Sequence, residues 1–198
     1  FGVARINGTF GVEKKTNQSL YISSATAANE LVSAANLLSI GLANVTGFVG
    51  FGTTGLTLTG VDLAIALWSE TTGALRSWTS VMGNVASATF GGVDGLTLTA
   101  TGVAIVVNKK ANDNTVVDYV VGTGETAGTA TVLSIPTSSS SADDVTFTID
   151  DTNGDYTRVT GSAVIDLFGV ASITGTFGVE KKTGQDLSLI HISQGIVR

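Results

Sequence analysis

The first twenty residues of the chain return 167 positions later with sixteen identities. FGVARINGTFGVEKKTNQSL begins at Phe1, and FGVASITGTFGVEKKTGQDL begins at Phe168. A chain that starts and ends at the same phase of a long repeat is typical of one period of a tandem array. We therefore expect one repeat module over residues 1–187, with neighbouring repeats of the same chain as its partners.

The last residues, 188–198, depart from this repeat. Similarity between the two ends stops near Leu187, and the final segment reads SLIHISQGIVR. The string LSLIHI resembles the translation of a sequencing adapter, as in a reading frame clipped from a shotgun assembly of metagenomic DNA. We interpret residues 188–198 as a non-native tail, with an authentic final strand as the alternative. His191, the one histidine of the chain, lies inside this segment.

The composition favours β-strands and excludes several classes of protein. The chain has 25 glycines and one proline, and it is rich in Thr, Val and Ile, as strand-rich proteins with tight turns are. It contains no apolar stretch of about 18 residues, so we expect no membrane insertion by a helix. A net charge of −6 argues against nucleic acid and against anionic membrane surfaces. The absence of cysteine removes disulfides and thiolate metal sites.

A second, shorter repeat lies inside the long one. The motif GLTLT at Gly55 returns at Gly95, an offset of 40 residues. Four apolar stretches result, at residues 38–51, 56–68, 78–90 and 96–108. Within each stretch side chains alternate with period two, which indicates strands. The alternation slips by one residue at Gly60 and again before Val103, which predicts bulges or corners.

The connections between these stretches are short and polar. They favour antiparallel neighbours, because a parallel crossover needs a dozen or more residues. We predict an all-β fold: a bent, mostly antiparallel strand meander that forms one repeat unit of an extended array. A β-solenoid, in which the slips are corners, is the alternative. Residues 25–38 are rich in Ala and predict either a short helix or a loop.

One polar cluster has the alternation of a calcium loop. Asp151, Asn153 and Asp155 are spaced as oxygen ligands of calcium are. The stretch lacks the glutamate that completes an EF-hand, and a β-hairpin between residues 145–149 and 156–159 explains the same residues without a metal. Calcium at these three residues is therefore one hypothesis beside the hairpin. We expect no other cofactor.

The sequence offers little for catalysis, and we expect that the chain is not an enzyme. Residues 1–187 contain no histidine, so a Ser/His/Asp arrangement cannot form there. Asp62, Asp118 and Asp166 lie inside strand-like runs. They are candidates for a carboxylate pair that hydrolyses glycosides, or simply polar residues on half-exposed strands.

Three aromatic residues near strand ends are candidates for a ligand surface. Trp68, Trp78 and Tyr119, if exposed, would suit a surface glycan or a protein ligand, and the chain would then be a carbohydrate-binding module. Trp68 and Trp78 flank the same turn, however, so their packing against each other is the alternative.

The motifs GLTLTGVDLAIAL, WTSVMGNVASATFGGVDGLTLTATGVAIVVN, TVVDY and VIDLFGVASITGTFGVEKK together cover nearly all of residues 1–187. They resemble the strand-rich tandem repeats of giant secreted bacterial adhesin-like proteins, which often carry repeats-in-toxin segments. The resemblance implies an extracellular or cell-surface location, one-step export, and a structural or adhesive role without catalysis. The calcium-binding nonapeptide Gly-Gly-x-Gly-x-Asp is missing here, and the resemblance implies no site residue.

Overall fold

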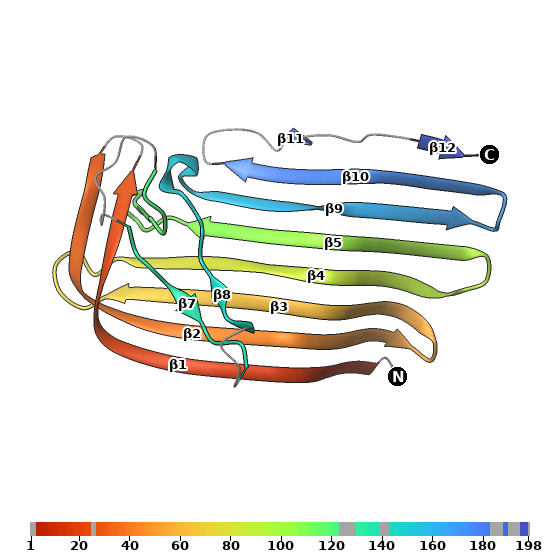
Figure 1. The fold of residues 1–198 in the computed structure, drawn as a ribbon, viewed down its shortest axis with the longest axis horizontal. Helices are drawn as coiled ribbons and strands as arrows, with labels where there is room; N and C mark the ends of the chain where they lie inside the picture. The colour runs from red at the N-terminus through yellow and green to blue at the C-terminus, as the bar shows by residue number, and fades with distance from the viewer. Residues whose placement is uncertain are drawn as a thin grey trace.

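The computed structural model describes residues 3–24, 27–122, 130–138, 143–182, 188–189 and 195–197, and it confirms the predicted all-β class (Figure 1). The strands are β1 (Val3–Ser24), β2 (Ala27–Phe51), β3 (Thr54–Glu70), β4 (Ser77–Val93), β5 (Leu96–Lys109), β6 (Val116–Val117), β7 (Ser134–Ile135), β8 (Val145–Thr146), β9 (Tyr156–Leu167), β10 (Ala171–Lys182), β11 (Ser188–Leu189) and β12 (Gly195–Val197). A 3-10 turn, η2 (Asp151–Asn153), precedes β9. No helix in the described ranges is long and apolar enough to cross a membrane.

The long strands form one antiparallel sheet in the order β10-β9-β5-β4-β3-β2-β1. Each strand from β1 to β5 pairs with the next, as the meander predicts, and the solenoid alternative is wrong because every long neighbour is antiparallel. β9 returns to pair with β5, so the described residues of the segment 110–155 between them (110–122, 130–138 and 143–155) lie outside the β5–β9 pairing. We call this segment the excursion. Short β11 and β12 lie along the outer edge of β10.

β1 and β2 turn away from the other strands at one end of the sheet (Figure 1). There Ile22 and Ser23 of β1 pair with β6 of the excursion. The helix or loop predicted for residues 25–38 is wrong, because the described part of this segment belongs to β2. Val32 and Leu37 of this strand are buried in the core. Pairing with β1 and the burial of these side chains outweigh the helix preference of the alanines.

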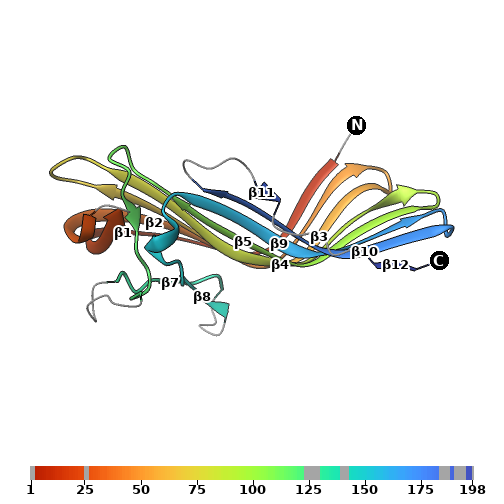
Figure 2. The same ribbon diagram turned by 90° about the horizontal axis from the view of Figure 1, so that it is seen from above.

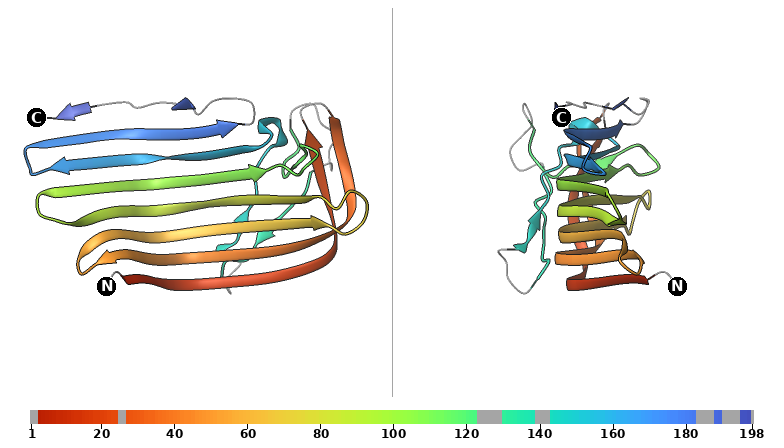
Figure 3. Two further views of the ribbon diagram at one scale, coloured as in Figure 1. Left: turned by 180° about the vertical axis from the view of Figure 1, so that it is seen from behind. Right: turned by 90° about the vertical axis from the view of Figure 1, so that its right-hand side faces the viewer.

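The excursion packs on one face of the sheet, at the end where β1 and β2 turn (Figure 3). We call this face the inner face and the opposite one the outer face. Trp68, Trp78 and Tyr156 of the sheet are buried there against the excursion. The excursion contributes Ala111, Val117, Tyr119, Leu133, Ile135, Phe147 and Ile149 to this core. Half of the sheet is therefore covered on its inner face.

A row of valines separates this covered half from the open half of the sheet. Val45, Val61, Val85 and Val103 pair successively across β2 to β5, and the sheet bends near this row (Figure 2). Beside the row, Asn44, Gly60 and Gly102 have left-handed φ values of 49°, 58° and 57°.

These left-handed residues confirm the slips that the alternation predicts at Gly60 and before Val103. An extra residue reverses which side chains point to which face. Leu63 in the covered half and Leu58 in the open half therefore lie on the same, outer face, although their spacing is odd. The slips keep the apolar residues of each bent strand on one face.

We expect Gly60→Ala to destabilise the fold by about 1–3 kcal/mol, because a Cβ disfavours left-handed φ. The added Cβ would also lie 2.8 Å from the Cβ of Ala86. Gly91→Ala is the matched control, since its Cβ would meet nothing within 4 Å and its φ is not left-handed. Urea unfolding followed by tryptophan fluorescence measures both; equal effects would contradict the assigned role of Gly60.

Candidate functional site

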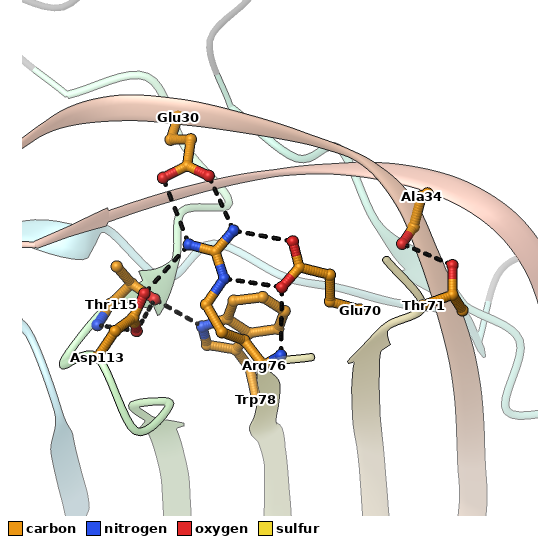
Figure 4. A network of polar contacts seen from close by, with 8 residues as sticks. All are labelled: Glu30, Ala34, Glu70, Thr71, Arg76, Trp78, Asp113 and Thr115. Carbon is orange, nitrogen blue, oxygen red and sulfur yellow. Dashed lines mark hydrogen bonds and ion pairs between the residues drawn. The ribbon is translucent and has the colours of Figure 1, made fainter. Parts of the chain in front are cut away.

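Four charged side chains meet at the covered end of the sheet, around Arg76 (Figure 4). The Nε and Nη2 atoms of Arg76 donate to the two carboxylate oxygens of Glu70, each at 3.0 Å. Nη2 also donates to Glu30 at 2.8 Å, and Nη1 donates to Asp113 at 3.1 Å. The side chains of Arg76 and Glu70 are each only 8% exposed. Three carboxylates thus surround one largely buried guanidinium group.

The four residues come from segments that the fold must hold together. Glu30 lies in the turned part of β2, Glu70 ends β3, Arg76 precedes β4, and Asp113 belongs to the excursion. The guanidinium carbon of Arg76 lies 5.5 Å from the ring centre of Trp78, within cation–π range. The cluster therefore joins the sheet, the turned strands and the excursion at one point.

The electrostatics of the cluster oppose acid–base chemistry. Hydrogen bonds from Arg76 lower the pKa of Glu70 despite its burial. Burial tends to raise the pKa of Asp113, but hydrogen bonds from Thr115 and Arg76 lower it overall. Hydrogen bonds to Glu70 and Glu30 raise the pKa of Arg76. The lowered pKa values keep the carboxylates of Glu70 and Asp113 ionised near neutral pH, so neither is suited to donate a proton. The arrangement is that of an electrostatic clamp.

A chain of buried hydrogen bonds lies beneath the clamp. Trp68 Nε1 donates to the hydroxyl of Tyr119 at 3.1 Å, and this hydroxyl donates to Ser80 at 3.0 Å. Ser80 donates to Asn108 Oδ1 at 3.0 Å, and Asn108 Nδ2 donates to the carbonyl of Val117 at 2.8 Å. Burial raises the pKa of Tyr119, so this phenol stays neutral. The chain links β3, β4 and β5 to the excursion.

The aromatic candidates for a ligand surface are buried. Trp68, Trp78 and Tyr119 are 4%, 2% and 3% exposed, so the prediction that they form a binding surface is wrong. Trp68 and Trp78 are direct cross-strand partners, as the alternative predicts. Tyr119 packs on Phe147 with ring centres 4.9 Å apart. These residues build the core because each aromatic body finds apolar neighbours and each polar tip finds a partner.

The candidate calcium residues lie around η2. Asp151 and Asn153 belong to this turn, and Asp155 accepts a hydrogen bond from Lys109 Nζ at 3.1 Å. The described residues contain no group of three or more His, Cys, Asp or Glu side chains placed to hold a metal. Calcium binding at Asp151, Asn153 and Asp155 stays a prediction.

The β-hairpin offered as the alternative to calcium is wrong. Residues 145–146 pair with β7 inside the excursion, whereas Tyr156 begins β9, which pairs with β5 and β10. The Asn153–Gly154 step does make a turn, in which Gly154 has a φ of 61°. The two segments that this turn joins have different strand partners, because residues 145–149 pack into the core on the inner face of the sheet.

The three aspartates considered for glycoside hydrolysis lie in different parts of the fold. Asp62 accepts a hydrogen bond from the backbone N–H of Asn44 at 2.7 Å, beside the bend. Asp166 accepts one from Gly169 at 3.0 Å, in the turn between β9 and β10. Asp118 is fully buried in the excursion, where it accepts from Val120. Asp62 and Asp166 thus stabilise nearby backbone, whereas Asp118 also accepts from Asn29 Nδ2 at 3.0 Å and so joins the excursion to β2.

A small depression of about 250 Å³ lies beside the excursion, between β1, β2 and Pro136. Its lining is Gly11, Val12, Glu13, Ser39 and Pro136. The carboxylate of Glu13 is paired with Lys15 at 3.0 Å, and no second titratable group lines the depression. His191 lies outside the described residues. The clamp, which the sequence reasoning missed, is thus the most developed polar cluster in the described part of the chain.

Comparison with known proteins found no matching family model, no matching curated protein and no matching solved structure. The resemblance to strand-rich repeats of secreted adhesin-like proteins therefore stays a prediction, which depends on the motifs of this chain alone.

We expect Arg76→Ala to lower the free energy of unfolding at neutral pH by about 2–3 kcal/mol, because it leaves the buried Glu70 carboxylate without its partner. Arg158→Ala is the control, since Arg158 lies exposed on β9. Urea titrations at pH 7 give both values. An Arg76 variant as stable as the control would show that the clamp is dispensable.

The clamp also predicts how stability depends on pH. The folded-state pKa values of Glu70 and Asp113 are lowered, so their stabilisation is fully present above their unfolded values of about 4 and is lost as the pH falls through the folded values. We expect the melting temperature to fall between about pH 5 and pH 2, and less steeply in Arg76→Ala. Parallel pH profiles for the two proteins would contradict this assignment.

Proposed function

We propose that this chain is one period of an extended β-sheet array, which serves as a non-catalytic structural and adhesive module of a large secreted or cell-surface bacterial protein. The observation that carries the proposal is the relation between β1 and β10. β1 and β10 contain corresponding parts of the two copies of the duplicated sequence, and they are the outermost long strands on opposite sides of one sheet.

β1 and β10 match in direction. Five antiparallel steps lead from β1 through β2, β3, β4 and β5 to β9, and a sixth leads to β10. Because six is even, β10 runs the same way as β1. A second period that began at β10 would therefore continue the same antiparallel order. An odd number of antiparallel steps would have reversed it.

The two strands also match in facing. Successive strand partners place Val12 and Val179 on the outer face, and Glu13 and Glu180 on the inner face. Lys15 pairs with Glu13 at 3.0 Å, and Lys182 pairs with Glu180 at 3.3 Å, so the same ion pair recurs. Direction and facing are independent conditions, and a repeat by translation requires both.

The partners of the edge strands indicate where neighbouring periods would attach. β10 pairs with β9 over twelve consecutive residues without a shift. The equivalent edge of β1 pairs, in the described part of the chain, only with β6 at Ile22 and Ser23. The β9 strand of a preceding period would fill the remainder of that edge. An unpaired strand edge is otherwise a site of aggregation.

The register gives the dimensions of such an array. Each period would add six strands, or about 29 Å at the usual strand spacing. A row of successive strand partners on the outer face begins at Val12 of β1 and ends at Lys181 of β10. In the sequence repeat, Lys181 corresponds to Lys14, which lies two residues after Val12. Each period would therefore be displaced along the strands by two residues, about 7 Å. A long, narrow ribbon of this kind suits a spacer that holds other parts of a protein away from a cell surface.

A tandem protein tests the proposal. Residues 1–167 are followed directly by residues 1–182, so that β1 of the second period takes the place of β10 in the first. We expect a urea midpoint above that of residues 1–182 alone, because the second β1 is paired on both edges. Amide exchange should be slow in this second β1 and fast at the outer edge of the first.

The matched control contains the same strands without the shared one. Two copies of residues 1–182, joined by a long Gly/Ser linker, should unfold at the midpoint of the single copy. Equal midpoints for the single copy and the direct tandem, or fast exchange in the second β1, would refute the array.

A further inference from the structure

We infer that the outer face of the sheet binds a second copy of this chain, face to face, in a β-sandwich. This interface would use the broad side of the sheet, whereas the proposed array uses its edges. The two are independent, because each can form without the other.

The outer face is apolar from one edge strand to the other. At one end of the open half, a row of successive strand partners consists of Ala4, Val49, Leu56, Phe90, Leu98, Ile165 and Ile173. In the covered half, the equivalent row consists of Phe10, Leu42, Leu63, Gly83, Ile105, Val159 and Val179. Val49 and Phe10 are 64% and 53% exposed. Between these rows lie the valines of the bend.

Charges on this face are confined to its margin. Among the long strands as described, alternation and register place only three charged residues on the outer face: Lys14, Lys109 and Lys181. All three stand at the covered end, and Lys109 is paired with Asp155 at 3.1 Å. The acidic excess of the chain therefore lies on the turns, the excursion and the inner face. The outer face itself is free of charge at its centre, as the core of an interface is.

The other surfaces of the sheet need no partner. The covered half of the inner face packs on the excursion, whose described strands β7 and β8 lie on this side only (Figure 3). The open half of the inner face carries hydroxyl groups, such as those of Thr57, Thr89 and Thr99, which water can solvate. Thr89 and Thr99 are also within 3.5 Å of each other across the strands. Of the two faces of the described sheet, the outer one carries the larger exposed apolar area.

The area of this face fits a stable dimer. Seven strands and five rows of outward side chains span about 1,100 Å², from the usual strand spacing and rise per residue. The largest apolar patch of a typical monomer is about 300–600 Å², and a standard interface buries about 800 Å² of each partner. The span of the outer face is larger than such a patch, and it suffices for a specific interface even though the bend valines Val45, Val85 and Val103 are only 5%, 7% and 9% exposed.

A second copy is the occupant that these properties favour. Two twisted sheets pack with their strands aligned to within about 30°, and a two-fold axis would bring the apolar rows of one copy against those of the other. A lipid surface would also accept apolar side chains. Lysines at the margin of an apolar face would favour anionic membranes, but the net charge of −6 repels such membranes.

Sedimentation velocity on the full chain tests the inference. We expect twice the chain mass of 20.0 kDa at micromolar concentration. Ile65→Lys, in the covered half of the outer face, should weaken the dimer by about 100-fold or more, because the dimer would bury an unpaired charge. Val49→Lys should also weaken it, and since Val49 is exposed this variant leaves the monomer fold intact.

Thr89→Lys is the control with the same added charge, because Thr89 lies on the inner face of the open half. It should dimerise like the unaltered chain, and circular dichroism should show the same strand content in every variant. Three results would overturn the inference: the unaltered chain sediments as a monomer; Val49→Lys and Ile65→Lys dimerise unchanged; or the chain is monomeric and floats with phosphatidylcholine vesicles, which would identify lipid as the occupant.

Discussion

The buried hydrogen-bond chain from Trp68 to the backbone of Val117 holds the excursion on the sheet, and the fold depends on this attachment. Tyr119, Ser80 and Asn108 are buried, and each has a hydrogen-bond partner in the chain. A buried polar group that loses its partner destabilises a fold strongly, so the excursion is restricted to one position. That position places β6 beside β1 and brings Asp113 to Arg76. The clamp then closes the end of the core that the hydrogen-bond chain organises.

Much of the sheet could be predicted because its rules are local. Alternation with period two located the strands from β2 to β5, and the phase slips located the left-handed residues Gly60 and Gly102. These features depend only on side-chain direction and on the freedom of glycine at positive φ, both of which are properties of neighbouring residues.

The excursion and the clamp depend on contacts between distant residues, and local patterns do not contain them. Arg76 bonds to Glu30 and Asp113, which are 46 and 37 residues away, so the sequence suggested only a charged turn. The hairpin predicted across Asn153–Gly154 failed for the same reason, because Phe147 and Ile149 are buried in a core built by remote strands. Trp68 and Trp78 seemed candidates for exposure only because the excursion that covers them could not be located.

The phase slips connect the two surfaces on which the module would meet other molecules. β9 and β10 have no left-handed residue, whereas β2, β3 and β5 have one each beside the bend. A junction between periods would therefore be made of regular strands, which pair without a shift, while the bend would stay inside each period. Because each slip also returns the apolar residues to the outer face, that face is continuous across bent and regular strands alike. Pairing along the edges would leave this face uncovered, so a longer array would need a covering partner more, and not less, than a single period does.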